Sequence, residues 1–221
     1  AVYSTIRYLN YDPSLGSNNW VTTGFSLTTA RYSHNVEFLN GRIYIFGGYT
    51  SVVSPTAIAS CESFSIWNLG APSTTAEPSM NFGRADMASA VYGGSIFVFG
   101  GTGSAGTVEI FNPEEGSWRL IDKNMPHEHI KGEAVVHDDY IYVIGGKDSS
   151  DNFVPFADIF DPTKMEWVGS IRMTQEISDF VAGVHNNNVI VATGRTASQN
   201  WTDDIRAVLP RNRNQTEDIA P

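Results

Sequence analysis

Short apolar strands that end in glycine recur along the chain with a period near 50 residues. The pattern is clearest at residues 42–48, 95–101 and 140–146, where five strand-forming residues precede a glycine doublet, and a weaker copy occupies residues 189–194. The last glycines of the four copies are spaced 53, 45 and 48 residues apart and are Gly48, Gly101, Gly146 and Gly194. A period of this size indicates a repeat architecture.

Three further strands belong to each copy. An apolar strand precedes the glycine strand, and the two are joined by the dipeptides Asn40-Gly41, Gly93-Gly94, Asp138-Asp139 and Asn186-Asn187. These residue types suit hairpin turns, which need positive φ. Two more strands follow the glycines, so each unit has four antiparallel strands, whose positions we call a, b, c and d, with the glycines closing b. No segment shows a 3.6-residue period over helical length, which predicts an all-β chain.

A proline turn followed by tryptophan marks the change from strand c to strand d. Phe111-Asn112-Pro113 precedes Trp118, Phe160-Asp161-Pro162 precedes Trp167, and Tyr11-Asp12-Pro13 precedes Trp20. Proline fixes φ and the Asn or Asp side chain bonds its own backbone, so the step favours a turn that ends strand c. We expect each tryptophan to bury its ring between neighbouring sheets.

Together, the glycine doublet, the aromatic-Asx-Pro step and the downstream tryptophan resemble the kelch motif. The resemblance covers nearly all of residues 1–209 and implies a kelch-type β-propeller of about four to five blades, each of four antiparallel strands. The second unit departs from the motif because no tryptophan occupies the expected place near Ser73. This departure puts the outer strand of that blade in question, but not the fold.

The repeat assigns the whole chain to one propeller and a tail. The expected parts are a half-blade c–d at 1–29, blades at 30–80, 81–125 and 126–173, a half-blade a–b–c at 174–209, and a polar tail at 210–221. Kelch propellers commonly close by completing one blade from both termini, which removes open strand edges. Here the strands fit four blades with one c strand too many, five blades with two incomplete, or a head-to-tail assembly of several molecules.

Composition narrows the classes of partner. The chain carries 24 acidic and 14 basic residues, a formal charge of −10, so it repels phosphate backbones and nucleic acid is not an expected partner. The longest apolar runs are too short to cross a bilayer, so no membrane span is expected. A hydrophobic content of 41% suffices for a core. The chain begins at Ala1, which fits a processed mature protein as well as an excised fragment.

Two glycosylation sequons favour an extracellular location over the cytoplasm. They begin at Asn200 and Asn214, in the sequences Asn200-Trp201-Thr202 and Asn214-Gln215-Thr216. Cys61 is the only cysteine and is expected to be a buried thiol or an intermolecular link.

Aligning the repeats brings Arg31, Arg84 and His129 to one position, directly before strand a. In kelch proteins that bind peptides, arginines at this mouth of the channel often grip acidic partners, and the resemblance implies the same role for these three residues. The alternative is that each pairs with an acidic neighbour between blades.

Three other motifs are weaker candidates for a functional site. His127 and His129 are weak metal candidates, because the sequence fixes no third ligand. Residues 101–106 match G-x-G-x-x-G, but a strand follows them and a nucleotide site needs a helix there, so we expect a b–c loop. Ser33 and His34 are adjacent and cannot form a catalytic pair by themselves. No cofactor is expected.

The sequence therefore predicts a non-enzymatic, extracellular binding or structural module that contacts protein partners, or itself, through propeller loops and incomplete terminal blades. The alternative is an enzyme of the galactose-oxidase or sugar-modifying type, which the wider superfamily includes.

Overall fold

Five antiparallel sheets follow one another along the chain in the computed structural model, which describes residues 2, 4–12, 17–68, 74–197 and 201–208. The first sheet is the hairpin of β1 (Thr5–Asp12) and β2 (Ser17–Ser26). The first complete blade contains β3 (Asn35–Leu39), β4 (Arg42–Phe46), β5 (Cys61–Ser65) and β6 (Thr75–Glu77), with a 3-10 turn η1 (Ile66–Asn68) after β5.

Two more complete blades and a terminal sheet follow. The second blade contains β7 (Ala88–Tyr92), β8 (Ser95–Phe99), β9 (Val108–Asn112) and β10 (Ser117–Leu120). The third contains β11 (Glu133–His137), β12 (Tyr140–Ile144), β13 (Phe156–Asp161) and β14 (Glu166–Arg172). The terminal sheet contains β16 (Val181–His185), β17 (Asn188–Thr196) and β18 (Trp201–Val208), with the short β15 (Ile177–Ser178) also paired to β17.

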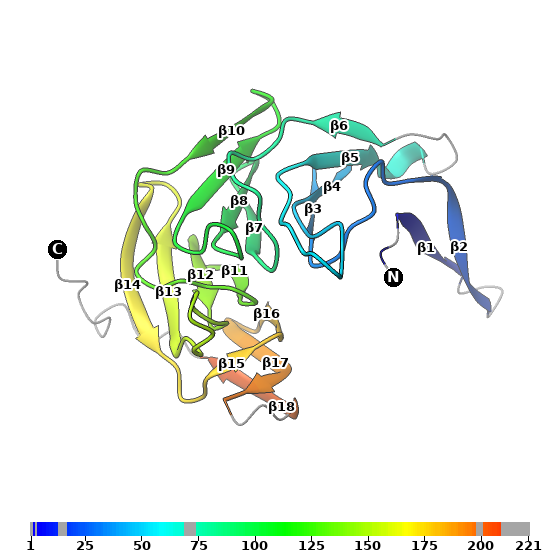
Figure 1. Cartoon of the computed structure of the whole chain (residues 1–221). Helices are drawn as coiled ribbons and strands as arrows, with labels where there is room; N and C mark the ends of the chain where they lie inside the picture. Colours follow the sequence, from blue (N-terminus) through cyan, green and yellow to red (C-terminus); the bar gives the residue numbers. More distant parts are fainter. Residues whose placement is uncertain (1, 3, 13–16, 69–73, 198–200, 209–221) are drawn as a thin grey trace.

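These sheets form a propeller arc, as the kelch resemblance predicts (Figure 1). The innermost strands contact one another in order, β3 with β7, β7 with β11 and β11 with β16. The hairpin lies at one end of the arc and the terminal sheet at the other, and each forms a sheet of its own (Figure 1). In the residues that the structure describes, three four-stranded blades lie between the hairpin and the terminal sheet.

Two details differ from the sequence-based expectation. Strand β1 continues through Asp12, so Tyr11 and Asp12 lie in the strand and not in the turn predicted there. The outer strand of the first complete blade, left in question by the motif, is present but short, as β6. Ser73, the tail at 210–221 and the sequon residues Asn200 and Asn214 lie outside the described residues. In the ranges given above, no helix is long and apolar enough to cross a membrane.

Glycine doublets set how closely neighbouring blades approach. Gly47 and Gly48 have φ of +66° and +94°, a backbone region that side chains rarely adopt. A Cβ on Gly47 would lie 2.5 Å from the carbonyl oxygen of Arg84 in the next blade. In the fourth copy, Thr193 replaces the first glycine of the doublet and has the same positive φ, at +60°.

Two backbone hydrogen bonds repeat at each of the three junctions between blades. In one, the second glycine donates to the next blade, in the pairs Gly48 N–Arg84 O (2.7 Å), Gly101 N–His129 O (2.9 Å) and Gly146 N–Ile177 O (2.7 Å). In the other, a residue before strand a donates to its counterpart in the preceding blade, in the pairs Asp86 N–Ser33 O (3.0 Å), Lys131 N–Asp86 O (2.7 Å) and Asp179 N–Lys131 O (3.0 Å). Consecutive blades are therefore joined by one recurring interface.

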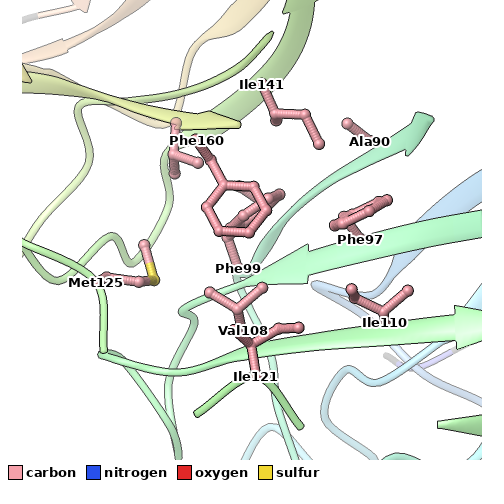
Figure 2. Packing of buried hydrophobic residues seen from close by; sticks show 11 residues of the cluster. Ala90, Phe97, Phe99, Val108, Ile110, Ile121, Met125, Ile141 and Phe160 are labelled. Atoms are coloured by element: carbon pink, nitrogen blue, oxygen red, sulfur yellow. The ribbon is translucent and has the colours of Figure 1, made fainter. Parts of the chain in front are cut away.

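Alternating strand residues supply the apolar part of that interface. Between the second and third blades, Phe97 and Phe99 pack against Phe160, with ring centroids 6.1 and 5.8 Å apart (Figure 2). Val108, Ile110 and Ile141 complete this buried layer. Period-two alternation places every second side chain on the face that a neighbouring blade covers.

Each tryptophan was expected to bury its ring between sheets, and two of the three are half-buried with the ring packed on the preceding blade. Trp118 contacts Phe46 of the preceding blade, at 5.9 Å between rings, and Trp167 contacts Phe99 in the same way, at 6.0 Å. Trp20 is instead 69% exposed. The reason is positional, because these tryptophans pack on the preceding blade and the hairpin is the first sheet of the arc.

Replacing Gly47 by alanine is expected to lower the free energy of unfolding by about 3 kcal/mol or more, because the Cβ collides with the next blade and the positive φ is strained. Gly116 is the matched control, since its φ is also positive (+60°) but a Cβ there meets nothing within 4 Å. Gly116→Ala should cost only about 1 kcal/mol. Equal losses in urea unfolding would show that close approach does not matter.

Candidate functional site

Arg31, Arg84 and His129 occupy equivalent places in the three complete blades, and all three are buried, with exposures of 3, 0 and 0%. Each meets an acidic residue on strand c of its own blade. The pairs are Arg31–Glu62 at 2.7 Å, Arg84–Glu109 at 2.9 Å and His129–Asp158 at 3.2 Å. The structure thus shows pairing with an acidic neighbour, within a blade and not between blades.

Each basic side chain also binds the backbone of its own glycine doublet. Arg31 Nη1 donates to the Gly47 carbonyl at 3.0 Å, and Arg84 Nη1 donates to the Gly100 carbonyl at 2.8 Å. His129 Nδ1 contacts the Gly145 carbonyl at 2.6 Å. These carbonyls lie where the chain turns sharply out of strand b, so the basic groups satisfy buried acceptors there.

The acidic partners hold the loop that enters the blade. Glu62 accepts from the backbone N–H of Thr28 at 2.7 Å and of Thr29 at 3.2 Å. Burial acts to raise the pKa of Glu62, but these hydrogen bonds outweigh it and lower the pKa below its ordinary value. Glu109 holds Asn81 and Phe82 in the same way. Each ion pair therefore connects the loop that enters the blade, strand c and the glycine doublet.

In the third blade, Asp158 contacts both His127 and His129, the two histidines that the sequence offered as weak metal candidates. His127 Nδ1 lies 2.8 Å from Asp158, and its ring stacks on Phe156 at 4.0 Å. Both ring nitrogens of His129 face acceptors, so the ring donates to both only when it carries two N–H groups. Burial opposes ionisation of Asp158, but hydrogen bonds from His127 and His129 lower its pKa to about 2.

This geometry gives the histidines bonds within the protein. In the part of the chain that the structure describes, no group of three or more His, Cys, Asp or Glu side chains is placed to hold a metal ion. The roles of Arg31, Arg84 and His129 in binding a partner stay predictions. As positioned, these side chains reach a partner only if the loops around them open.

Other polar groups lie on the innermost strands. Ser89 on β7 donates to Glu37 on β3 at 2.6 Å, and Asn35 donates to Ser89 at 2.8 Å. Burial, together with the nearby Glu37 carboxylate, raises the pKa of Glu133 on β11 to about 7. This pair of carboxylates was not found from the sequence, because separation across blades is not readable from residue spacing.

Cys61 and residues 101–106 were the remaining chemical candidates. Cys61 is buried on β5, and its burial raises the pKa of the thiol to about 12, so the thiol stays protonated at neutral pH. Residues 101–106 form a loop followed by strand β9, as expected. Neither group is presented for nucleophilic or phosphate-binding chemistry.

The exposed candidate surface lies on the loops. Residues 47–60, between β4 and β5, form the longest b–c loop of the complete blades. Val52 and Val53 on it are 58% and 90% exposed. The Ile58 carbonyl of this loop accepts from the N–H of Arg84, which holds the loop against the next blade beside the exposed Phe82.

Four-stranded antiparallel blades that meet at glycine doublets define the class of kelch-type β-propellers. The chain belongs to the kelch-repeat family, because the profile of the KLHDC2/KLHL20/DRC7 Kelch-repeats domain matches residues 10–194.

Similar proteins agree with this assignment. The chain is 30% identical to beta-scruin of Limulus polyphemus over 201 residues, which cover 85% of the chain and 22% of the scruin. It is 27% identical to Kelch-like protein 35 of Mus musculus over 80% of the chain and 28% of that protein. The chain thus spans about a quarter of the length of these relatives. The solved structure of YjhT matches with a TM-score of 0.65 at 12% identity, covering 93% of this chain and 89% of that one, which shows the shared fold.

Removing one member of a buried ion pair is expected to lower the free energy of unfolding more than removing both members. Arg84→Met leaves Glu109 buried without its cation and should lower the free energy of unfolding by about 3–5 kcal/mol. The double variant Arg84→Met/Glu109→Leu removes both charges and should recover a large part of that loss. Chemical denaturation of the two single variants and the double variant measures the coupling. Additive losses would mean that the pair does not act as a unit.

Proposed function

We propose that the chain is a non-enzymatic protein-binding module that contacts its partner through the loops at the glycine-doublet end of the blades. Kelch-repeat propellers serve in protein–protein interaction, and membership of that family supports the proposal. The charge of −10 favours a partner with basic or neutral surface around an apolar centre.

The observation that carries the proposal is the exposure of Val52 and Val53. Val53 is 90% exposed although its loop is anchored at both ends, by Tyr49 pairing with Tyr32 and by Ile58 bonding to Gly48. An anchored loop presents these apolar side chains at small entropic cost, which is how rigid scaffolds use loops to bind.

Val52→Asp/Val53→Asp is expected to abolish retention of the protein partner while leaving stability nearly unchanged, because both side chains are exposed. Immobilised full-length protein and variant are compared for the proteins they retain, by quantitative mass spectrometry. Val168→Asp on β14 is the control, as this valine is also exposed but lies on an outer strand. Identical retention by all three proteins would contradict the role of the loop.

We also propose that the protein is extracellular and glycosylated, on the strength of the sequons at Asn200 and Asn214. Expression in a secreting eukaryotic cell should give a product whose electrophoretic mobility increases on treatment with an N-glycosidase. Asn200→Gln and Asn214→Gln should each remove part of that shift. A product without glycans at either position would contradict the proposal.

Self-assembly through the incomplete terminal blades completes the proposal. A hairpin of c and d strands at one end and a sheet of a, b and c strands at the other are consistent with head-to-tail contact between copies.

A further inference from the structure

The third blade differs from the first two in the chemistry of its buried ion pair. Arg31 and Arg84 supply the cation in the first two blades, and His129 supplies it in the third. A guanidinium group keeps its charge at every pH of interest, but an imidazole gains or loses its charge between about pH 5 and 8. Of these three equivalent ion pairs, only His129–Asp158 can therefore lose its cation near neutral pH.

His129 needs its proton to satisfy both of its neighbours. Its Nδ1 lies 2.6 Å from the Gly145 carbonyl oxygen, its Nε2 lies 3.2 Å from Asp158 Oδ2, and the side chain is fully buried. A carbonyl oxygen only accepts, and a protonated imidazole has two N–H groups to donate. The neutral ring has one N–H group, so its other nitrogen would direct a lone pair at an oxygen. Because the ring is inaccessible to water, that oxygen would lose its donor without replacement.

Asp158 stays an acceptor throughout the range in which imidazoles titrate. Besides contacting His129, it accepts from the His127 backbone N–H at 3.0 Å and from the Ser170 hydroxyl at 2.6 Å, and it lies 2.8 Å from His127 Nδ1. Burial opposes its ionisation, but hydrogen bonds from both histidines lower its pKa to about 2. The carboxylate therefore remains ionised after His129 has lost its proton, and protonation of Asp158 cannot relieve the mismatch.

Arg84 forms more hydrogen bonds than its histidine counterpart does. Its guanidinium group donates to the carboxylate of Glu109 and to three carbonyl oxygens, those of Gly100, Ser104 and Thr107. The histidine makes one carbonyl contact and one carboxylate contact, so the loss of one proton removes half of them.

The loop that contains His129 also joins two blades. It comprises residues 121–132, between β10 and β11. The His129 carbonyl accepts from the Gly101 N–H of the second blade at 2.9 Å, and the Lys131 N–H donates to the Asp86 carbonyl at 2.7 Å. Displacement of His129 therefore weakens the junction between the second and third blades.

The other charged groups around His129 have partners of their own. Within the loop and across the junction, these contacts are Lys131–Asp179 at 3.3 Å, Glu128–Ser149 N–H at 2.6 Å and Arg84–Glu109 at 2.9 Å. The second blade meets His129 with the backbone of Gly100 and Gly101, which have no side chain to titrate. Among the residues that the structure describes, His127 is thus the one further ionisable group bonded to the His129–Asp158 pair.

We propose that the loop at residues 121–132 is a pH-sensitive element of the propeller, held in place while His129 is protonated and released as the pH rises. The loops at Arg31 and Arg84 stay in place over the same range. The loop lies at the glycine-doublet end, so its release alters that face of the molecule. The inference goes beyond the binding function proposed above and does not depend on it.

The direction of the effect follows from the form of His129 that makes both bonds. The protonated ring stabilises the loop, so the loop loses stability as the proton is removed in alkaline solution. The contribution of Asp158 has the opposite limit, because its pKa is lowered: it is lost only as the pH falls from the ordinary value of 3.8 toward about 2. The loop is therefore most stable in mildly acidic solution.

Amide hydrogen exchange of the full chain measures the opening of each loop. The Gly101 N–H bonds to the His129 carbonyl, and the Gly48 N–H bonds to the Arg84 carbonyl, so the two amides report on equivalent junctions. After correction for the intrinsic exchange rate, protection of Gly101 should fall about tenfold or more between about pH 5.5 and pH 8, and protection of Gly48 should stay constant. A constant ratio of the two protection factors overturns the proposal.

Exchanging the ion pairs between blades tests the cause. His129→Arg/Asp158→Glu gives the third blade the residue types of the first two, and it should abolish the pH dependence at Gly101. Arg84→His/Glu109→Asp makes the reciprocal change and should introduce pH dependence at Gly48. If the first exchange leaves the pH dependence of Gly101 intact, the ion pair is not its origin. Where an exchanged variant does not fold, the comparison of Gly101 with Gly48 in the wild type still decides.

His127→Gln separates the two histidines that contact Asp158. The His127 side chain is one-third exposed and that of His129 is fully buried. In this variant the fall in Gly101 protection should persist, and the imidazole ¹⁵N resonances of His129 should show two N–H groups in acid and one in alkali. A loss of the pH dependence in His127→Gln would show that His127 is the titrating group and would overturn the assignment to His129.

Discussion

Close approach of consecutive blades at the glycine doublets is the constraint on which the propeller depends. The backbone N–H of Gly48 reaches the Arg84 carbonyl at 2.7 Å, and a side chain on Gly47 would fill the space between the blades. Only a residue without Cβ tolerates both the positive φ and the contact. Because the same pair of hydrogen bonds recurs at the three junctions from the first complete blade to the terminal sheet, the glycines fix the spacing there, and the apolar layers then pack at that spacing.

The buried ion pairs follow from that constraint. A chain that turns sharply after strand b exposes carbonyl groups to the interior, and Arg31 and Arg84 donate to them while Glu62 and Glu109 neutralise the guanidinium charges. The terminal sheet differs from the complete blades at this position. Ile177 stands where the other blades have Arg or His, so no ion pair of this kind can hold its third strand.

Repetition explains which features could be predicted from the sequence. The period, the strands and the glycine turns are encoded locally in each copy, so the kelch fold follows from residues 42–48 and their counterparts. Burial of Arg84 does not follow, because its partner Glu109 is 25 residues away and reaches it only through the blade. The exposure of Trp20 was also missed, since its motif matches that of Trp118 and only its place at the start of the arc differs. Local patterns carry no information about which sheet lies beside each copy.

In a repeat protein each unit contacts only its neighbours, so the surfaces left at the two ends are the surfaces that are buried in the middle. Val36 and Phe38 are exposed for the same reason that Ile96 and Val98 are buried: one blade has a full neighbour and the other has half of one. The interior junctions already show that this pattern of contacts is stable. The interaction that joins blades within the chain is therefore one repeated pattern, and the exposure of a side chain depends on which sheet lies beside its blade.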